Sequence, residues 1–201
     1  MRKYERLLVL FVLCVVMFNC NTSKKKGDGA NGNFSDFFEE FIVAFNQKNT
    51  LEINKCFNPD YGFFVIDNPG AFSVVRHFDS FDEIMKMEGE YDIAYLKVLK
   101  VDCDLKNDKK PFYECETGWD KEGCYLEKYP KFKISDYYKT MIEYELTDSN
   151  AVKEEMDLSV ESETMITHLA YSTEAPIGFY FAMINEKWYL LCIDRVTPCS
   201  A

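Results

Sequence analysis

The chain has 201 residues and a formal net charge of −11 at pH 7, with 17 Phe and 13 Tyr. Residues 1–33 contribute +4, from six Lys or Arg and two Asp or Glu, so the remaining residues carry −15. This charge repels phosphate backbones and excludes nucleic acid as an expected partner, while cationic ligands and basic proteins stay open. Residues 34–201 are numerous enough to bury a hydrophobic core as a single domain.

The N-terminus combines a short basic segment with an apolar run. Arg2, Lys3 and Arg6 precede the run, which extends for 12 residues from Leu7 to Phe18. A membrane-spanning helix needs roughly 20 apolar residues, so this run is too short to span and has the length of a signal-peptide core. We therefore expect residues 1–19 to be a signal peptide.

Cys20 follows the apolar run after Asn19, without the small-residue cleavage site of a freely secreted protein. This arrangement resembles a bacterial lipoprotein signal, in which the cysteine becomes the diacylated N-terminus, although Met17, Phe18 and Asn19 are bulkier than the usual preceding residues. The alternative, a buried cysteine in an uncleaved anchor, conflicts with the short run. We expect lipidation at Cys20, a flexible tether over residues 20–33, and a cell-envelope location on the periplasmic or outer-surface face.

The first part of the domain predicts helices. Residues 34–45 carry Phe and Ile at the spacing of one helix face, and residues 50–57 predict a second, shorter helix. Ser80 and Glu83 form a capping-box pattern, which starts a further helix that stops near Gly89.

Short apolar or alternating runs bounded by turn residues predict strands. The last two, IGFYFAMI and KWYLLCID, are joined by Asn185-Glu186, a turn-prone pair placed as in a hairpin. Helices followed by mostly antiparallel strands indicate an α+β class, with the helices packed on one face of the sheet. The predicted strands cover residues 62–66, 71–78, 95–105, 112–116, 165–171, 177–184 and 187–194.

The middle of the domain has weaker patterns. Residues 117–133 look loop-like because they contain Gly118, Gly123 and Pro130. Residues 135–146 fit both a capped helix and an alternating strand, and both assignments stay open. Residues 147–164 are acidic and are expected to form a solvated surface excursion.

The chain contains eight cysteines. Cys14 leaves with the signal peptide and Cys20 takes lipid, so six remain in a compartment that permits disulfides. A short closure such as Cys115–Cys124 is favoured, and free buried cysteines are the alternative. The sequence has no C-x-x-C and no H-x₃₋₅-H pair, so we expect neither a thioredoxin-like motif nor a zinc site. The six candidates are Cys56, Cys103, Cys115, Cys124, Cys192 and Cys199.

The Phe-rich helix pair, the strand–turn–strand, the further helix and the terminal KWYLLCID hairpin resemble the nuclear-transport-factor-2-like (cystatin-like cone) superfamily. Within it, the chain is most similar to Gram-negative lipoproteins of unassigned function, whose last strand often carries a Lys-Trp-Tyr-Leu run like Lys187–Leu190. The resemblance covers residues 34–100 and 165–195. It implies a strongly bent sheet that wraps the helices into a cone, with residues 103–160 as an elaboration.

Isomerases and dehydratases of this superfamily work in the cone pocket with Asp, His and Tyr. His77 and His168, the two histidines of the chain, lie on predicted strands and are the catalytic candidates. Tyr61 and Asp67 lie near His77 in sequence, and Tyr180 and Asp194 lie on the terminal hairpin. An acid–base pair needs groups within hydrogen-bond reach, which the sequence does not specify, and no catalytic motif of the family is present.

Trp119 lies in a Gly-flanked segment, where a tryptophan is suited either to stack on a ligand or to cover the edge of the core. The ligand-binding candidates are Tyr61, His77, Trp119, His168, Tyr180 and Trp188.

We expect a lipid-anchored extracytoplasmic binding or interaction module that is not an enzyme. Its cone pocket would bind a small apolar or amphipathic ligand, or its sheet a protein partner, and the lipid anchor would attach it to a membrane. We expect no metal, no cofactor and no nucleic acid. The alternatives are a pocket enzyme of the isomerase or dehydratase type, using His77 or His168 with a carboxylate, and a purely structural envelope protein.

Overall fold

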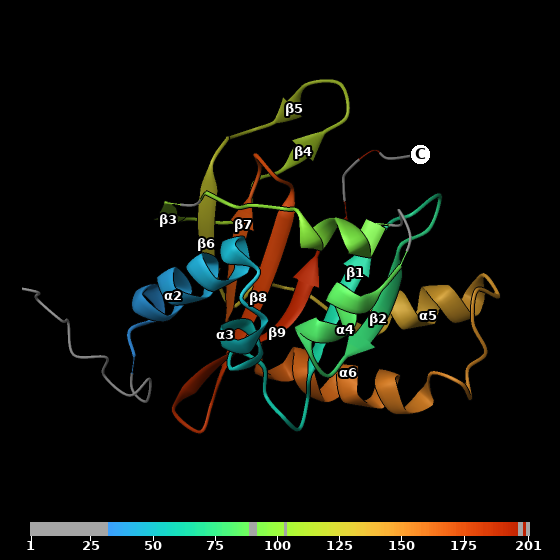
Figure 1. The fold of residues 1–201 in the computed structure, drawn as a ribbon. Helices are drawn as coiled ribbons and strands as arrows, with labels where there is room; N and C mark the ends of the chain where they lie inside the picture. Colours follow the sequence, from blue (N-terminus) through green and yellow to red (C-terminus); the bar gives the residue numbers. More distant parts are fainter. Residues whose placement is uncertain (1–31, 89–91, 103, 197–198, 200–201) are drawn as a thin grey trace, which may run out of the picture. The chain divides into compact units, whose positions relative to one another are not determined.

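A computed structural model describes residues 32–88, 92–102, 104–196 and 199 (Figure 1). The predicted signal peptide, Cys20 and most of the predicted tether lie outside the described residues, as does Cys103. In the described part of the chain, no helix has both the length and the apolar character needed to cross a membrane. The described residues fall within one unit, Asn31–Ala201.

The fold is mixed α+β and is built on a seven-stranded sheet with the order β2-β1-β9-β8-β7-β6-β3. The β1–β9 and β3–β6 pairs are parallel and the other neighbours are antiparallel, so the sheet is mixed. A small second sheet pairs β4 with β5. The strands are β1 (Phe63–Asp67), β2 (Val74–Phe78), β3 (Leu105–Asn107), β4 (Tyr113–Glu114), β5 (Gly118–Trp119), β6 (Cys124–Lys128), β7 (His168–Ser172), β8 (Ile177–Ile184) and β9 (Lys187–Asp194).

The predicted N-terminal helices are present, and their ends have identifiable causes. The Asn33 side chain caps the first helix by accepting the Ser35 N–H, and Ser80 with Glu83 forms the predicted capping box. Residues 135–146, left open by the sequence, contain a helix. The helical elements are α2 (Phe34–Gln47), α3 (Thr50–Asn54), α4 (Phe81–Lys86), the 3₁₀ helix η1 (Asp92–Lys97), α5 (Ser135–Glu143) and α6 (Lys153–Met165).

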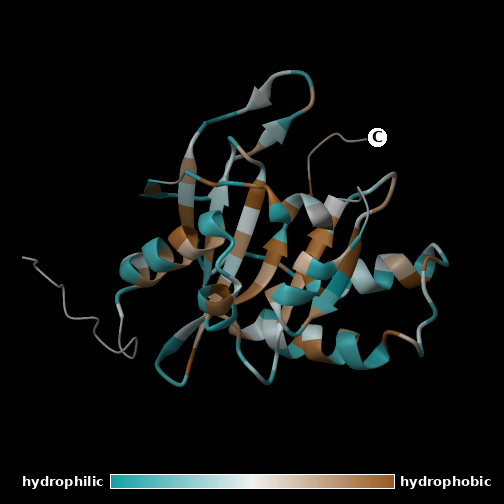
Figure 2. Ribbon diagram, viewed as in Figure 1, coloured by the Kyte–Doolittle hydropathy of each residue, from teal (hydrophilic) through white to brown (hydrophobic). Residues whose placement is uncertain are grey.

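Two apolar clusters meet the sheet from opposite faces, and strand β8 contributes to both. Because successive side chains alternate in a strand, Phe179 and Phe181 enter the cluster that contains the α2 phenylalanines, while Tyr180 enters the cluster that contains Tyr138 of α5. Phe41 of α2 lies edge-on to Phe179 and Phe181, with ring centroids 5.2 and 5.5 Å apart. Figure 2 shows the hydrophobic residues concentrated on the central strands β1, β8 and β9.

The β8–β9 hairpin is confirmed as predicted. Its two turn residues, Asn185 and Glu186, both have positive φ angles, 50° and 65°. Two positive φ values are the mark of a type I′ turn, whose twist matches that of the flanking strands.

The strand predicted over residues 95–105 is wrong for most of its length. Ile93 and Leu96 are buried three residues apart in η1, and only Leu105 belongs to a strand. Val101 is buried in the cluster that contains the α2 phenylalanines, and the Asn46 side chain accepts its N–H at 2.8 Å and donates to its carbonyl at 2.7 Å. A side-chain amide thus supplies the hydrogen bonds that a strand would otherwise make.

One further prediction for the middle of the chain is wrong, and another is incomplete. Residues 117–133 are not all loop, since they contain β5 and β6, and β6 pairs along its whole length with β7. The acidic stretch 147–164 is mostly exposed, as predicted, but it contains most of α6, a helix that the sequence pattern did not predict. The buried residues of α6 are Ser159 and Ser162, and a count of apolar residues cannot detect a buried face made of serine.

Candidate functional site

A cavity of about 270 Å³ lies beside His168, where the start of α2 faces strands β3, β6 and β7. A shallower groove of about 500 Å³ adjoins it over β3 and β6 and shares Asn107, Leu126 and Lys128 with it. Small-molecule sites typically measure about 300–1,000 Å³, so the cavity with its groove has room for a small ligand. The cavity is lined by Asn33, Phe34, Ser35, Leu105, Asn107, Leu126, Lys128 and His168.

The polar side of this cavity is cationic. The β6–β7 register puts Lys128 directly opposite His168, and none of the described residues that line the cavity is an Asp or Glu. The adjoining groove, in contrast, contains Asp108 and Glu127 beside Lys109. Burial lowers the pKa of His168 below its ordinary value, and the positive charge of Lys128 lowers it further. Phe34, Leu105 and Leu126 supply the apolar wall. The arrangement complements a ligand with an apolar body and an anionic group.

The orientation of His168 is fixed by its neighbours. Its ring centroid lies 4.6 Å from that of Phe34 and 4.7 Å from that of Trp188, and its Nδ1 lies 3.0 Å from the Thr167 hydroxyl. Trp188 is 8% exposed, and its Nε1 donates to the Gly32 carbonyl at 3.1 Å. The structure therefore brings two predicted candidates together, with Trp188 supporting His168 from the core side.

The second histidine candidate, His77, lies on β2 and is hydrogen-bonded to the main chain. Its Nε2 is 2.8 Å from the Tyr61 carbonyl oxygen, which can only accept, so Nε2 donates. Glu83 and Glu155 line the same surface groove of about 460 Å³. Glu83 is used in the α4 capping box and Glu155 accepts the Tyr138 hydroxyl at 2.8 Å, so both carboxylates have structural partners.

A third group of candidates lies on the opposite face of the sheet, around Asp194. The Tyr180 hydroxyl is 3.5 Å from Asp194 Oδ2, and the Lys110 ammonium is 3.4 Å from the same oxygen. Burial raises the pKa of Tyr180 well above its ordinary value, and the Asp194 charge raises it further. Phe132 stacks on Tyr180 with centroids 3.8 Å apart. Asp194 is thus a buried carboxylate next to an aromatic hydroxyl and a lysine.

Trp119 and Asp67, two further candidates, contact Tyr171 and Arg195, respectively. The Trp119 ring is half-buried and stands edge-on to Tyr171, 5.6 Å between centroids, as expected for a residue that covers the edge of the core. Asp67 is bonded to Arg195 at 3.1 Å, and the β1–β2 register places it opposite Val74, three residues from His77.

The favoured Cys115–Cys124 bridge is wrong, because Cys115 is bonded to Cys199 instead, with Cα atoms 5.8 Å apart. Cys124 is also disulfide-bonded. Cys56 and Cys192 are free thiols, as the alternative allowed. Burial raises the pKa of Cys56 to about 12 and that of Cys192 well above its ordinary value, so both stay protonated and unreactive at neutral pH. Within the described part of the chain, no three His, Cys, Asp or Glu side chains are placed to hold a metal ion.

Sequence reasoning missed Lys128 and Lys110, the two cations of these sites. Lys128 becomes relevant only through the β6–β7 register, and residues 117–133 gave no strand prediction from which a register follows. Lys110 lies in a predicted turn and reaches Asp194, 84 residues away. No local pattern in the sequence predicts a contact between residues so far apart.

Comparison with known proteins gave no match. No protein-family model matches the chain, and neither a curated protein nor a solved structure matches it.

Proposed function

We propose that this protein is a lipid-anchored, extracytoplasmic binding module, without enzymatic activity, that holds a small amphipathic anion in the His168 cavity. The observation that carries the proposal is the cavity itself, with an apolar wall on one side and Lys128 opposite His168 on the other. A buried apolar surface gives affinity, and a few convergent polar groups select the ligand.

The proposed compartment has chemical support. Disulfides form and persist outside the cytoplasm, and the Cys115–Cys199 bridge fits a chain exported by its signal peptide. The proposed anchor, a diacylated Cys20, attaches the domain to a membrane through the tether. Two acyl chains give stable attachment, whereas a single chain binds only marginally.

We also propose the cone-like fold of the nuclear-transport-factor-2-like superfamily. The support is the order of elements: α2 and α3, the β1–β2 hairpin, α4, and a terminal β8–β9 hairpin whose last strand lies next to β1. In this view, β3 to α6 form the elaboration, and the His168 cavity lies beside the start of α2.

The enzyme alternative lacks an acid–base pair with free groups. Among the described residues that line the His168 cavity there is no carboxylate, and the two beside His77 are engaged by their own structural partners. The pocket-enzyme alternative pairs His77 or His168 with a carboxylate, and the two groups must lie within hydrogen-bond reach. Binding without catalysis is the function that this geometry favours.

Octanoate is a suitable probe, because it combines an apolar chain with a carboxylate. We expect isothermal titration of the full chain in lipid nanodiscs to show octanoate binding, with empty nanodiscs as the blank. Lys128→Gln should weaken the affinity about tenfold, since one charge-assisted contact is worth about 1.5–3 kcal/mol. The neutral analogue 1-octanol should bind no tighter to the wild type than to this variant.

Lys133→Gln is the matched control, because Lys133 is exposed and lies outside the cavity lining. It removes the same charge and should leave the octanoate affinity unchanged. Equal weakening by both substitutions, or no octanoate binding at all, would contradict the ligand proposal. Capture of a protein partner that is insensitive to Lys128→Gln would favour an interaction module instead.

The anchor is tested by the intact mass of the native protein. We expect a mature chain that starts at Cys20 and carries acyl mass. A chain that retains Met1 and has no acyl mass would reject the anchor without affecting the cavity.

A further inference from the structure

The buried Asp194 carboxylate needs a cation or hydrogen-bond donors to compensate its charge. Its side chain is 4% exposed, and its Oδ1 accepts the Val196 N–H at 2.9 Å. Its Oδ2 faces the Tyr180 hydroxyl and the Lys110 ammonium. A carboxylate at this depth is unfavourable without a cation or several hydrogen bonds, so the position of the Lys110 ammonium is one in which positive charge is strongly stabilised.

Aromatic rings complete the surroundings of the Lys110 ammonium. Nζ lies 4.5 Å from the centroid of the Tyr171 ring, within the range of a cation–π contact. Tyr171 is in turn covered by Trp119. A carboxylate together with an aromatic face is the combination by which proteins recognise alkylammonium groups.

The group beside Asp194 is the ammonium of Lys110, a partly exposed side chain. Lys110 is 36% exposed and enters from the loop between β3 and β4, whereas Asp194 is almost fully buried. The ammonium of a partly exposed lysine can be hydrated outside the site, but its departure leaves the buried Asp194 carboxylate without a cation. An external amine that replaces the Lys110 ammonium restores that pairing.

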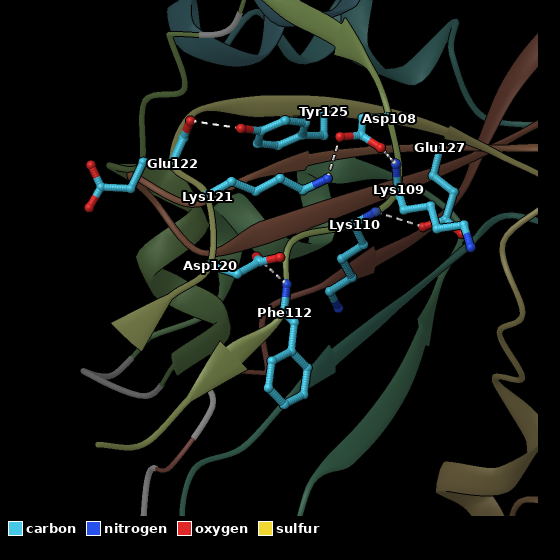
Figure 3. A network of polar contacts seen from close by, with 9 residues as sticks. All are labelled: Asp108, Lys109, Lys110, Phe112, Asp120, Lys121, Glu122, Tyr125 and Glu127. Carbon is cyan, nitrogen blue, oxygen red and sulfur yellow. Dashed lines mark hydrogen bonds and ion pairs between the residues drawn. The ribbon is translucent and has the colours of Figure 1, made fainter. Parts of the chain in front are cut away.

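The loop that carries Lys110 does not depend on its side chain. Figure 3 shows the Lys110 N–H donating to Glu127, at 2.8 Å, and the Phe112 N–H donating to Asp120, also at 2.8 Å. Asp108 of the same loop accepts a hydrogen bond at 2.6 Å from the ammonium of Lys121, a residue that follows β5. The Lys110 side chain takes no part in these contacts, so its removal should leave the loop in place.

We propose that Asp194, Tyr171 and Tyr180 form a binding site for a primary alkylammonium group, such as the amine of a lysine side chain or a small amine, and that Lys110 is its built-in competitor. The site shares no lining residue with the His168 cavity, and its ligand has the opposite charge. An external amine binds when the Lys110 ammonium moves to solvent, so the tethered lysine reduces the apparent affinity by the fraction of time it occupies the site.

The test uses the two tryptophans of the chain as separate reporters. The full chain, labelled with fluorotryptophan and purified in a nonionic detergent, is titrated with n-butylammonium chloride and followed by fluorine NMR. In Lys110→Ala, the Trp119 resonance should shift with a dissociation constant on the order of millimolar, at least about tenfold tighter than in the wild type. The Trp188 resonance, next to His168, should not move.

Lys109→Ala is the matched control, because Lys109 is the exposed neighbour of Lys110 and its substitution changes the net charge equally. It should behave as the wild type does. The double variant Lys110→Ala with Asp194→Asn should lose butylammonium binding, and 1-butanol should bind to none of the variants. Lys110→Met, which keeps the apolar stem, serves if Lys110→Ala does not fold.

The proposal is overturned if Lys110→Ala and Lys109→Ala give the same butylammonium affinity, or if the Asp194→Asn change leaves binding intact. It is also overturned if neither Lys110→Ala nor Lys110→Met folds, since Lys110 is then a structural residue. The Trp188 signal keeps this test separate from that of the cavity, because loss of octanoate binding there has no bearing on Trp119.

Discussion

The Cys115–Cys199 disulfide joins the middle of the chain to its C-terminal end, and its removal should be costly. The two residues are 84 apart in sequence, so the bridge closes a long loop in the unfolded chain. The chain-entropy relation gives about 4.5 kcal/mol for a loop of that length, and measured values for native bridges are typically about 2–4 kcal/mol. We expect the double variant Cys115→Ala with Cys199→Ala to lose about 2–4 kcal/mol of unfolding free energy.

The assay is equilibrium urea unfolding followed by circular dichroism and tryptophan fluorescence. If the bridge acts on the unfolded state, its removal expands that state, so the dependence of the free energy on urea should become steeper while the midpoint falls. Substitution is preferable to a reductant, because a reductant would also open the Cys124 disulfide.

Cys56→Ala is the control, since it removes a free thiol and no cross-link. It should leave the slope of the urea curve unchanged. The reasoning is refuted if the double variant unfolds within about 0.5 kcal/mol of the wild type, or if its midpoint falls with no change of slope.

Three further predictions concern single side chains. Phe41→Ala, at a fully buried ring, should cost about 3–5 kcal/mol in urea unfolding, and a cost below about 2 kcal/mol would contradict its assigned place in the core. Asn46→Ala should cost about 2 kcal/mol or more, because it leaves the buried Val101 N–H and carbonyl without partners, and unchanged stability would show that water replaces the amide. Burial lowers the pKa of His168, so the unfolded chain takes the proton first and the unfolding free energy should fall as the pH drops below about 6.5. His168→Gln should remove that component, and identical pH profiles of the two proteins would contradict the shift.

The strong periodic segments of the sequence predicted their own structure. The Phe repeat of α2 and the IGFYFAMI–KWYLLCID hairpin are local patterns, because the side-chain repeat of a helix or strand is determined by neighbouring residues. The capping box at Ser80 is local in the same way, since its partners lie three residues apart. These elements required no knowledge of what they pack against.

The prediction failed where a distant residue supplies the stabilising contact. The main chain of the buried Val101 is hydrogen-bonded by Asn46, 55 residues away, and the buried residues of α6 are two serines. Cys115 could not be paired from spacing, since its partner is brought near by the whole sheet and not by a short loop.

The sequence alone determined that His168 and Trp188 lie on strands, and that Tyr180 and Asp194 share a hairpin. Only the tertiary structure decided which candidates meet a cation: Lys128 faces His168 through the β6–β7 register, and Lys110 reaches Asp194 from a distant loop. The physical reason is that a strand fixes the spacing of its own side chains, whereas register and loop closure depend on the packing of every strand between them.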